Sequence, residues 1–443
     1  MLTGTKRFSS LDEWLHWQKT SHVRTIDLSL DRVRIVHARM QIGYQPFTFT
    51  VSGTNGKGSS VAILDSILRQ QGYRVGTYTS PHIINYNERI RINGAAIDDA
   101  DICAAFERVD AVRDDISLSF FEFGTLAALD IFSRSQVDVQ LLEVGLGGRL
   151  DAVNVIDADM PIVTNISIDH IAWLGKTRDK ISLEKAGIMR PGITAVVGDP
   201  DPPAVLLRWA DEHKVPISLS GRDFSFECCV DGWNWFGEYQ QYTQLPQPGL
   251  KGPHQYQNAA AVLQALSLSA KRMPVSEQSI RDGVEQVKLP GRFQLIDSNG
   301  VDSEPAVLVD VAHNPESAAL LALNLQHYYP QRRVLALFSV MADKDVAKIV
   351  DHMKDRVEKW YPVPLEIERA ATTDDMIAVL SRCGVKHDNE AFENFDEAWN
   401  AVIKDADCND HLIVIFGSFF LVAEYFQRHS TDLLTGFSRG AET

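Results

Sequence analysis

Short apolar runs, typical of buried strands, alternate with longer amphipathic stretches through the first two thirds of this chain. The pattern predicts strands near 47–52, 75–79, 138–143, 160–165 and 193–197. It predicts helices near 60–71, 98–112, 121–134, 178–189 and 203–213. Strands that alternate with helices are typical of a doubly wound α/β sheet, so we expect that architecture here.

A second α/β series follows after a break in the pattern. Residues 217–256 alternate aromatic and polar side chains and then carry three prolines, which predicts a small antiparallel excursion and a loop before a helix near 258–270. The second series has strands near 306–310, 333–338, 358–362 and 411–416, and helices near 315–328, 344–355, 373–382 and 393–404. Turn residues in Lys288–Phe293 place the boundary between them, so we expect domains at 1–290 and 291–443.

Composition narrows the class of protein. The 443 residues carry a net charge of -16, which argues against a nucleic-acid surface, where a basic stripe is expected. The five cysteines show no C-x-x-C spacing and are expected to be reduced thiols. The N-terminus has no apolar signal region, and no apolar run reaches the ~18 residues that a membrane span needs. We therefore expect a cytoplasmic protein, with a monomer as the default because no coiled-coil pattern is present.

The most informative segment is the glycine-rich run after the first predicted strand, Gly53-Thr-Asn-Gly-Lys-Gly-Ser59. A strand, a glycine-rich turn and a helix N-terminus form a cradle for phosphate, because backbone N–H groups and the helix dipole attract an anion. Lys57 would supply charge for the β and γ phosphates of a nucleotide. The match to G-x-x-x-x-G-K-[ST] is imperfect, since Val51 stands at the first glycine position and Gly58 follows the lysine. Glycine-rich turns also serve as plain strand-to-helix connections.

Polar side chains follow several of the other predicted strands. Ser80, Glu143 and His170 each stand at or just after a strand end, and open α/β sheets bind ligands at that edge. A hydroxyl, a carboxylate and an imidazole suit a divalent cation that bridges nucleotide phosphates, Mg²⁺ with Mn²⁺ as a substitute. A single strand-end glutamate is more often a salt-bridge partner, and a single histidine more often a structural group.

The second series ends one buried strand in Asp310-Val-Ala-His-Asn-Pro315. Asp310 is a candidate for hydrogen bonds to a ribose or to metal-bound water, whereas Asn314 before a proline-started helix reads as a helix cap. Arg292, at the domain boundary, is placed to reach a phosphate, although arginines there are commonly plain interface charges.

Taken in order, these segments resemble the bacterial folylpolyglutamate synthase/dihydrofolate synthase family of the Mur ligase superfamily. The motifs that carry the resemblance are Gly53–Ser59, Ser80-Pro-His82, Phe121–Thr125, Leu142–Ala152, Asp169-His170, Glu184–Gly187, Leu289–Arg292 and Asp310–Pro315. The resemblance implies a P-loop ATPase-like N-terminal domain, a smaller Rossmann-like C-terminal domain, and an ATP-dependent ligase that joins L-glutamate to a pterin-bearing carboxylate.

The resemblance also implies roles for particular residues. The ATP site would comprise Thr54, Asn55, Gly56, Lys57, Gly58, Ser59, Asn258, Arg292 and Asp310. The metal ligands would be Ser80, Glu143, His170 and Lys185, the last in carbamylated form. The pterin site would be formed by Ile26, Asp27, Leu28, Ser29, Ser119, Phe120, Phe121, Glu122, Leu150, Asp151 and Ala152, with Ser29 standing where glycine is expected. Lys57, Lys185 and His313 are the candidate catalytic residues, His313 for glutamate or phosphate.

The expected reaction uses ATP and Mg²⁺ to convert the acceptor's carboxylate into an acyl phosphate, which the amine of L-glutamate then attacks. The small-molecule partners would be dihydropteroate, folates and L-glutamate, with neither nucleic acid nor membrane involved. Three alternatives stay open: a folylpolyglutamate synthase that does not use dihydropteroate, a Mur-type ligase with another acceptor, and a non-enzymatic nucleotide switch.

Overall fold

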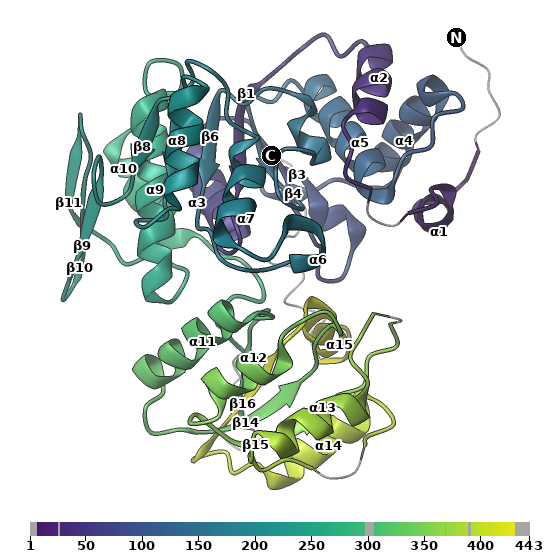
Figure 1. The fold of residues 1–443 in the computed structure, drawn as a ribbon, viewed down its shortest axis with the longest axis vertical. Helices are drawn as coiled ribbons and strands as arrows, with labels where there is room; N and C mark the ends of the chain where they lie inside the picture. Colours follow the sequence, from purple (N-terminus) through teal and green to yellow (C-terminus); the bar gives the residue numbers. More distant parts are fainter. Residues whose placement is uncertain (1–6, 25–26, 297–304, 368, 389–390, 430–443) are drawn as a thin grey trace, which may run out of the picture. The chain divides into compact units, whose positions relative to one another are not determined.

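A computed structural model describes residues 7–24, 27–296, 305–367, 369–388 and 391–429. The chain forms two compact units. Of the described residues, the first unit comprises those up to Gly249 together with Gln255–Val287, and the second comprises Leu250–His254 and those from Lys288 to His429. Figure 1 colours the chain along its sequence and labels the elements of each unit.

The first unit is built on an eight-stranded sheet with the order β4-β3-β2-β5-β1-β6-β7-β8. Its strands are β1 (Phe47–Ser52), β2 (Val75–Tyr78), β3 (Ile90–Ile92), β4 (Ala95–Ala96), β5 (Val139–Glu143), β6 (Met160–Val163), β7 (Ala195–Val197) and β8 (Ile217–Leu219). The strands β2, β5, β1, β6, β7 and β8 run parallel to one another. At one edge, β3 pairs antiparallel with β2, and β4 pairs antiparallel with β3. The five strands predicted from the sequence are all present, and the doubly wound α/β architecture is confirmed.

The helices of this unit are α1 (Leu11–Ser21), α2 (Asp31–Met40), α3 (Lys57–Gln70), α4 (Asp99–Arg113), α5 (Phe120–Arg134), α6 (Ile171–Leu174), α7 (Arg178–Ala186), α8 (Ala204–Glu212), α9 (Pro253–Ser269) and α10 (Glu277–Gln286). Two short 3-10 helices, η1 (Tyr86–Arg89) and η2 (Ala152–Val155), lie in its loops. The helices α1, α2, α6 and α10 were not predicted. In α1, Trp14 is fully buried and its ring packs near Phe106 and Phe123, so tertiary contacts stabilise this short helix.

Two predicted helix starts were wrong, and both errors bear on the site. The helix expected from about Ser60 begins at Lys57, and the helix expected from about Asn258 begins at Pro253. In α3 the early Gly58 has poor helix propensity, and α9 opens with the mostly polar Pro253–Gln257, so in both helices the apolar pattern starts later than the helix itself. The correction places Lys57 in the first turn of α3 and Asn258 inside α9.

The predicted antiparallel excursion is confirmed as a three-stranded sheet of β9 (Ser225–Cys229), β10 (Gly232–Phe236) and β11 (Gln241–Leu245). The side chains of Trp233 and Trp235 in β10 are fully buried. The indole of Trp235 donates a hydrogen bond to the carbonyl of Ala260 in α9, at 3.1 Å, which fastens this sheet to the helix.

The second unit is a five-stranded sheet with the order β12-β13-β16-β14-β15, in which only β12 is antiparallel to its neighbour. Its strands are β12 (Gln294–Ile296), β13 (Ala306–Val309), β14 (Arg333–Phe338), β15 (Val357–Pro362) and β16 (His411–Phe416). Its helices are α11 (Pro315–Tyr328), α12 (Val346–Met353), α13 (Thr373–Arg382), α14 (Phe395–Asp405) and α15 (Phe419–His429). The predicted α/β series is confirmed, and β12 and α15 are additions. Across the described residues of both units, no helix is long and apolar enough to cross a membrane.

Candidate functional site

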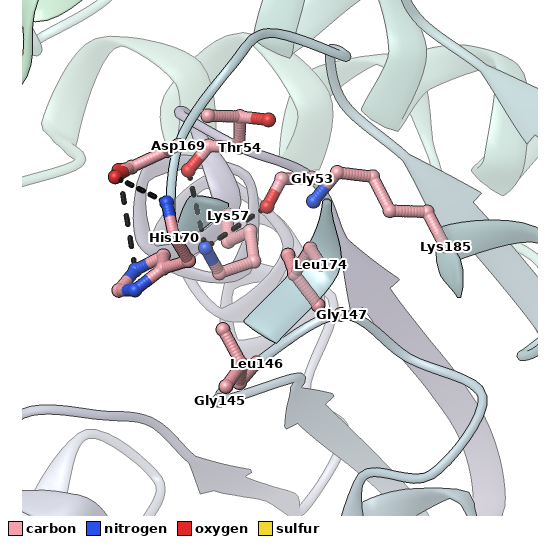
Figure 2. Close-up of a pocket in the computed structure, with 10 residues that line it drawn as sticks. All are labelled: Gly53, Thr54, Lys57, Gly145, Leu146, Gly147, Asp169, His170, Leu174 and Lys185. Atoms are coloured by element: carbon pink, nitrogen blue, oxygen red, sulfur yellow. Dashed lines mark hydrogen bonds and ion pairs between the residues drawn. The ribbon is translucent and has the colours of Figure 1, made fainter. Parts of the chain in front are cut away.

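The glycine-rich loop joins β1 to α3 as the sequence predicts. Gly56 is the N-cap of α3 and has φ +82, a left-handed conformation that favours glycine. A Cβ atom there would also lie 2.5 Å from Oδ1 of Asn258. Gly56 has no side chain with which to cap α3, and the N–H groups and the dipole at a helix N-terminus attract an anion. The amine of Lys57 turns back onto its own loop, donating to the carbonyls of Gly53 at 3.0 Å and Thr54 at 3.2 Å (Figure 2).

The side of the loop next to α9 is closed by two amide side chains. Asn258 donates to Oε1 of Gln255 at 3.0 Å, and Gln255 donates to the hydroxyl of Ser59 at 3.4 Å. Gln255 and Ser59 are buried, and Asn258 is only 8% exposed. Asn258 therefore lies beside the glycine-rich loop although it is about 200 residues away in sequence, whereas the contribution of Gln255 was missed.

The loop after β6 holds the glycine-rich loop from the other side. The Thr54 hydroxyl donates to the carbonyl of Ser167 at 3.0 Å and accepts from the Ser167 N–H at 3.0 Å. The backbone N–H of Thr54 donates to the carbonyl of Asn165, at 3.0 Å, and that of Asn55 to Oδ1 of Asn165, at 2.7 Å. In addition, Thr164 donates to the carbonyl of Asn55 at 2.6 Å. The two loops thus form one hydrogen-bonded structure.

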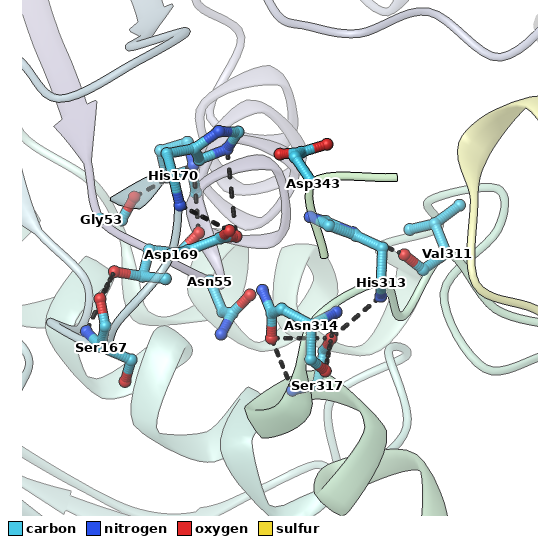
Figure 3. Close-up of polar contacts among 12 residues, drawn as sticks. Gly53, Asn55, Ser167, Asp169, His170, Val311, His313, Asn314, Ser317 and Asp343 are labelled. Carbon is cyan, nitrogen blue, oxygen red and sulfur yellow. Dashed lines mark hydrogen bonds and ion pairs between the residues drawn. The ribbon is translucent and has the colours of Figure 1, made fainter. Parts of the chain in front are cut away.

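Asp169 and His170 end the same β6 loop. The His170 backbone is left-handed, with φ +49, and its N–H donates to Oδ1 of Asp169 at 2.7 Å. Its ring Nε2 lies 3.9 Å from Oδ2 of Asp169 (Figure 3). The imidazole is more exposed than the carboxylate, with 37% of the His170 side chain accessible against 8% for Asp169. The pairing orients the ring while leaving it able to reach a ligand.

Ser80 and Glu143 lie at the ends of the neighbouring strands β2 and β5. The Ser80 N–H donates to Oε2 of Glu143 at 3.0 Å, and Glu143 is 5% exposed. Glu143 also stands opposite Val51 of β1 in the sheet, two residues before Gly53. A hydroxyl and a carboxylate are therefore adjacent at the edge of the sheet that carries the glycine-rich loop, and both are oxygen donors that Mg²⁺ prefers.

Lys185 reaches the same pocket from the last turn of α7. A pocket is lined by Gly53, Thr54, Lys57, Gly145, Leu146, Gly147, Asp169, His170, Leu174 and Lys185 (Figure 2). Lys185 is 2% exposed, and among the residues that the structure describes no hydrogen bond or ion pair to its amine is found. Burial, with the nearby charge of Lys57, lowers its pKa well below the usual range, and Asp169 opposes the shift. The sequence predicted a special lysine here only through its resemblance.

Asp151 closes the loop that follows β5. Its Oδ2 accepts from the N–H of Leu146 at 2.8 Å, and its Oδ1 from the N–H of Val153 at 3.1 Å. Burial raises the pKa of Asp151 to about 7, although these backbone donors lower it. Asp151 therefore shapes the Gly145–Asp151 loop and is also the N-cap of η2, a structural role that the sequence did not indicate.

The predicted pterin-site segments are connected through Arg32, which sequence reasoning missed. Arg32 donates to Oδ2 of Asp27 at 3.0 Å and to Oε1 of Glu122 at 2.9 Å. Glu122 is buried and also accepts from the N–H of Ser119 at 2.7 Å, as the N3 residue of a capping box on α5. The S-x-x-E spacing of Ser119 and Glu122 could have shown this cap in the sequence.

The aromatic and apolar members of those segments lie nearby. The ring of Phe121 packs so tightly on Gly145 that a Cβ atom there would lie 2.8 Å from it, which joins α5 to the loop before Asp151. Ala152 is buried, whereas Leu28, Ser29, Phe120 and Leu150 are partly exposed. Ile26 lies outside the described residues. The segments around 27–29, 119–122 and 150–152 are thus brought together within the first unit.

The remaining candidates form a cluster in the second unit. Asp310 accepts from the N–H groups of Phe293 and Ala312, each at 2.7 Å. Loss of hydration raises the pKa of Asp310, and Arg292 opposes that shift. The His313 ring accepts or donates at Nδ1 to the carbonyl of Val311, at 2.8 Å (Figure 3).

A phenylalanine that the sequence analysis did not single out as a site residue links two of these residues. The guanidinium carbon of Arg292 lies 5.1 Å from the ring centre of Phe419, and the His313 ring lies 6.0 Å from it. Asn314 caps α11 by accepting from the N–H of Ser317 at 2.9 Å, so the helix-cap interpretation of Asn314 is confirmed. Phe419 follows the Gly417-Ser418 turn at the end of β16, a strand end that could have pointed to it.

Comparison with known proteins relates both units to enzymes. A family model described as "Mur ligase, glutamate ligase domain" matches residues 291–419. The chain is 40% identical to the dihydrofolate synthase/folylpolyglutamate synthase of Escherichia coli (strain K12), over 95% of each chain. It is 34% identical to the Haemophilus influenzae protein of that name, over 95% of this chain and 98% of the relative.

Solved structures agree with this relationship. Escherichia coli FolC in complex with DHPP and ADP is similar with a TM-score of 0.89 and 39% identity, over 96% of this chain and 99% of that one. A bifunctional folylpolyglutamate synthase/dihydrofolate synthase with Mn, AMPPNP and L-glutamate bound gives a TM-score of 0.86 and 38% identity, over the same shares of the two chains.

Proposed function

Because the chain belongs to the dihydrofolate synthase/folylpolyglutamate synthase family of ATP-dependent ligases, we propose that it adds L-glutamate to 7,8-dihydropteroate, giving dihydrofolate, and to reduced folates, giving folylpolyglutamates. The observation that carries this proposal is the pocket in which the glycine-rich loop, His170 and buried Lys185 meet. Such a pocket suits phosphoryl transfer assisted by a divalent metal.

The nucleotide site is proposed to comprise the loop from Thr54 to Ser59 with Asn258. The N-terminus of α3 and the left-handed Gly56 before it support a phosphate there. Lys57 lies in the first turn of α3, where its amine can give up its hydrogen bonds to the carbonyls of Gly53 and Thr54 and bind a phosphate oxygen instead. In the second unit, Arg292 and Asp310 are proposed as further contacts to ATP, and His313 as a contact to glutamate or phosphate.

The metal ligands are proposed to be Ser80, Glu143 and His170, with a carbamate on Lys185. Among the described residues, no group of three or more His, Cys, Asp and Glu side chains is placed to hold a metal alone. The donor set therefore needs the serine hydroxyl and one more anion, and a carbamylated lysine supplies that anion. When bound, Mg²⁺ or Mn²⁺ would neutralise charge on the phosphates.

Carbamylation fits the surroundings of Lys185. Burial lowers the pKa of the Lys185 amine, which favours its neutral form, and a neutral amine adds to CO₂, forming an N–C bond and releasing one proton. The modification also gives this buried side chain a negative charge close to the cation of Lys57, so the two groups attract each other.

The acceptor's pterin is proposed to lie among the segments Ile26–Ser29, Ser119–Glu122 and Leu150–Ala152. The contacts from Arg32 to Asp27 and Glu122 support this assignment, because they hold two of the segments at a fixed separation. Asp151 and the Phe121 ring define the third side of this region.

The reaction proceeds in two displacements. An acceptor carboxylate oxygen attacks the γ-phosphorus of ATP, forming an O–P bond and releasing ADP. The α-amino group of L-glutamate then attacks the acyl carbon, an amide bond forms, and inorganic phosphate leaves with one proton lost from the amine. Lys57 and the loop N–H groups are proposed to neutralise the transferring phosphoryl group, and the pocket to exclude the water that would hydrolyse the acyl phosphate.

We further propose that the functional domains are residues 1–290 and 291–443, and that the enzyme acts as a monomer in the cytoplasm. Small molecules are its only proposed partners. The test of function is phosphate release from ATP with Mg²⁺ and L-glutamate, comparing 7,8-dihydropteroate with tetrahydrofolate. Turnover with both, lost in Lys57→Ala, supports the bifunctional enzyme.

Turnover with tetrahydrofolate alone would leave a folylpolyglutamate synthase, and turnover with neither would reject the proposal. Phosphate release that needs neither acceptor nor glutamate would indicate a nucleotide switch, whose hydrolysis is not coupled to ligation.

A further inference from the structure

Arg89, the last residue of η1, is a buried cation without a buried anion beside it. It is 9% exposed, and within the described part of the chain no carboxylate lies within 4.0 Å of its guanidinium nitrogens. Three partly buried arginines of this unit do have such partners. Arg32, Arg108 and Arg113 lie 3.0, 2.5 and 2.8 Å from aspartate oxygens. Burying an unpaired charge is costly, so an anion is expected to reach Arg89 from outside the chain.

The groups around Arg89 are neutral. Its Nε donates to Nδ1 of His82 at 2.8 Å, and its guanidinium carbon lies 5.6 Å from the Tyr86 ring centre and 5.4 Å from that of Phe120. These contacts orient the guanidinium, because its Nε is fixed by a hydrogen bond and two aromatic rings lie close to it. They do not neutralise its charge.

His82 adds a second donor to this place. Because its Nδ1 accepts a hydrogen bond from Arg89, the neutral ring carries its proton on Nε2. His82 is partly exposed and follows Ser80 by two residues. A guanidinium and an imidazole N–H beside aromatic rings match an organic carboxylate of an aromatic molecule better than they match a hydrated inorganic anion.

The location connects this pair to the acceptor. Phe120 belongs to the segment proposed to hold the pterin, and His82 belongs to the loop that begins with the proposed metal ligand Ser80. We propose that Arg89 and His82 form a subsite for a carboxylate of the acceptor. The inference rests on the proposed function and names the group that holds the acceptor's acidic end. The anion is either the carboxylate that reacts or the non-reacting α-carboxylate of a folate.

A cycle that changes both protein and ligand tests this subsite. Calorimetry with ADP and Mg²⁺ present measures binding of 7,8-dihydropteroate and of its primary amide to the full chain and to Arg89→Gln. The full chain is expected to prefer the carboxylate by about 10- to 100-fold, and Arg89→Gln to lose that preference while keeping its affinity for the amide. His82→Gln, which leaves the buried Arg89 in place, is expected to lose part of the preference for the carboxylate over the amide. Arg134→Gln, an exposed arginine on α5, is the matched control and should change nothing.

A second ligand pair identifies the carboxylate. If the preference persists for dihydropteroate but tetrahydrofolate loses affinity relative to its α-amide in Arg89→Gln, Arg89 binds the non-reacting carboxylate. If tetrahydrofolate instead loses affinity relative to its γ-amide, with no change relative to the α-amide, Arg89 binds the reacting carboxylate. A carboxylate preference that is unchanged for both dihydropteroate and tetrahydrofolate in Arg89→Gln and in His82→Gln overturns the proposal, as does an equal loss of affinity for acid and amide. Failure of the proposed function is distinct, since the unaltered chain would then release no phosphate with any acceptor.

Discussion

Removing the Thr54 hydroxyl tests whether the glycine-rich loop and the loop after β6, which carries His170, are energetically coupled. Thr54→Val keeps the shape of the side chain but removes both hydrogen bonds to the backbone of Ser167, each 3.0 Å long. A net hydrogen bond contributes about 1 kcal/mol, and a backbone group left without a partner costs about 1–3 kcal/mol where it is buried. Thr54 is only partly buried, so we expect a total loss of about 1–3 kcal/mol.

The assay is twofold. Urea unfolding measures the loss of stability. Phosphate release measured across a range of ATP concentrations, and separately across a range of Mn²⁺ concentrations, gives the apparent affinities for ATP and for the metal. Because the two loops share this contact, both affinities should fall, each by roughly tenfold for a 1.4 kcal/mol loss. Thr54→Ser keeps the hydroxyl and should behave like the unaltered protein. A Thr54→Val variant that weakens ATP alone, with normal metal dependence, would refute the idea that the loops are coupled.

Three further changes test other parts of the site. Gly56→Ala should abolish ATP binding in calorimetry and lower stability by about 1–2 kcal/mol, because φ is +82 and the new Cβ would meet Asn258. The control is Gly72→Ala, which has φ +93 but open space around it, and it should lower stability without affecting ATP binding. Lys185→Met should fold but release phosphate at least ~100-fold more slowly, and intact-protein mass spectrometry near neutral pH should find an added CO₂ only on the unaltered chain. Asp151 has a pKa raised to about 7, so its contribution to stability is full below its unfolded pKa and is lost as pH rises through 7. Unfolding free energies of Asp151→Asn should lack that dependence between about pH 4 and 7, and an unchanged pH profile would contradict the assignment.

The local sequence pattern was sufficient to predict the strands and loops whose own residues give a clear signal. Buried strands such as Phe47–Ser52 are apolar runs bounded by turn residues, and the glycine-rich loop follows the first of them directly in sequence. The sequence analysis missed α1 and α10 although each has a local start signal, a capping box of Ser10 and Glu13 on α1 and the N-cap Ser276 on α10. In α10, Gly283 packs against Ile67 of α3, with 2.5 Å from an added Cβ to the Ile67 Cα.

For the candidate site, the sequence by itself determined which residue types stand at strand ends. In a parallel sheet, those ends share one edge, so Ser80, Glu143 and His170 could be expected together before any coordinates existed. Only the tertiary structure decided what these groups touch. It joined Asn165 and Ser167 to the glycine-rich loop, and it connected Arg32 to two segments about 90 residues apart.

The charged residues of the site show the same difference between what the sequence specifies and what the tertiary structure decides. The sequence contains Lys185, Asp151 and Arg89 as ordinary ionisable residues, and nothing local distinguishes them from their many exposed counterparts. Folding removes the water around each of them and leaves Lys185 and Asp151 with shifted pKa values and Arg89 without a carboxylate partner among the described residues. Hydration is lost only when segments distant in sequence pack together, which is why a sequence can name such residues while the tertiary structure alone decides their chemistry.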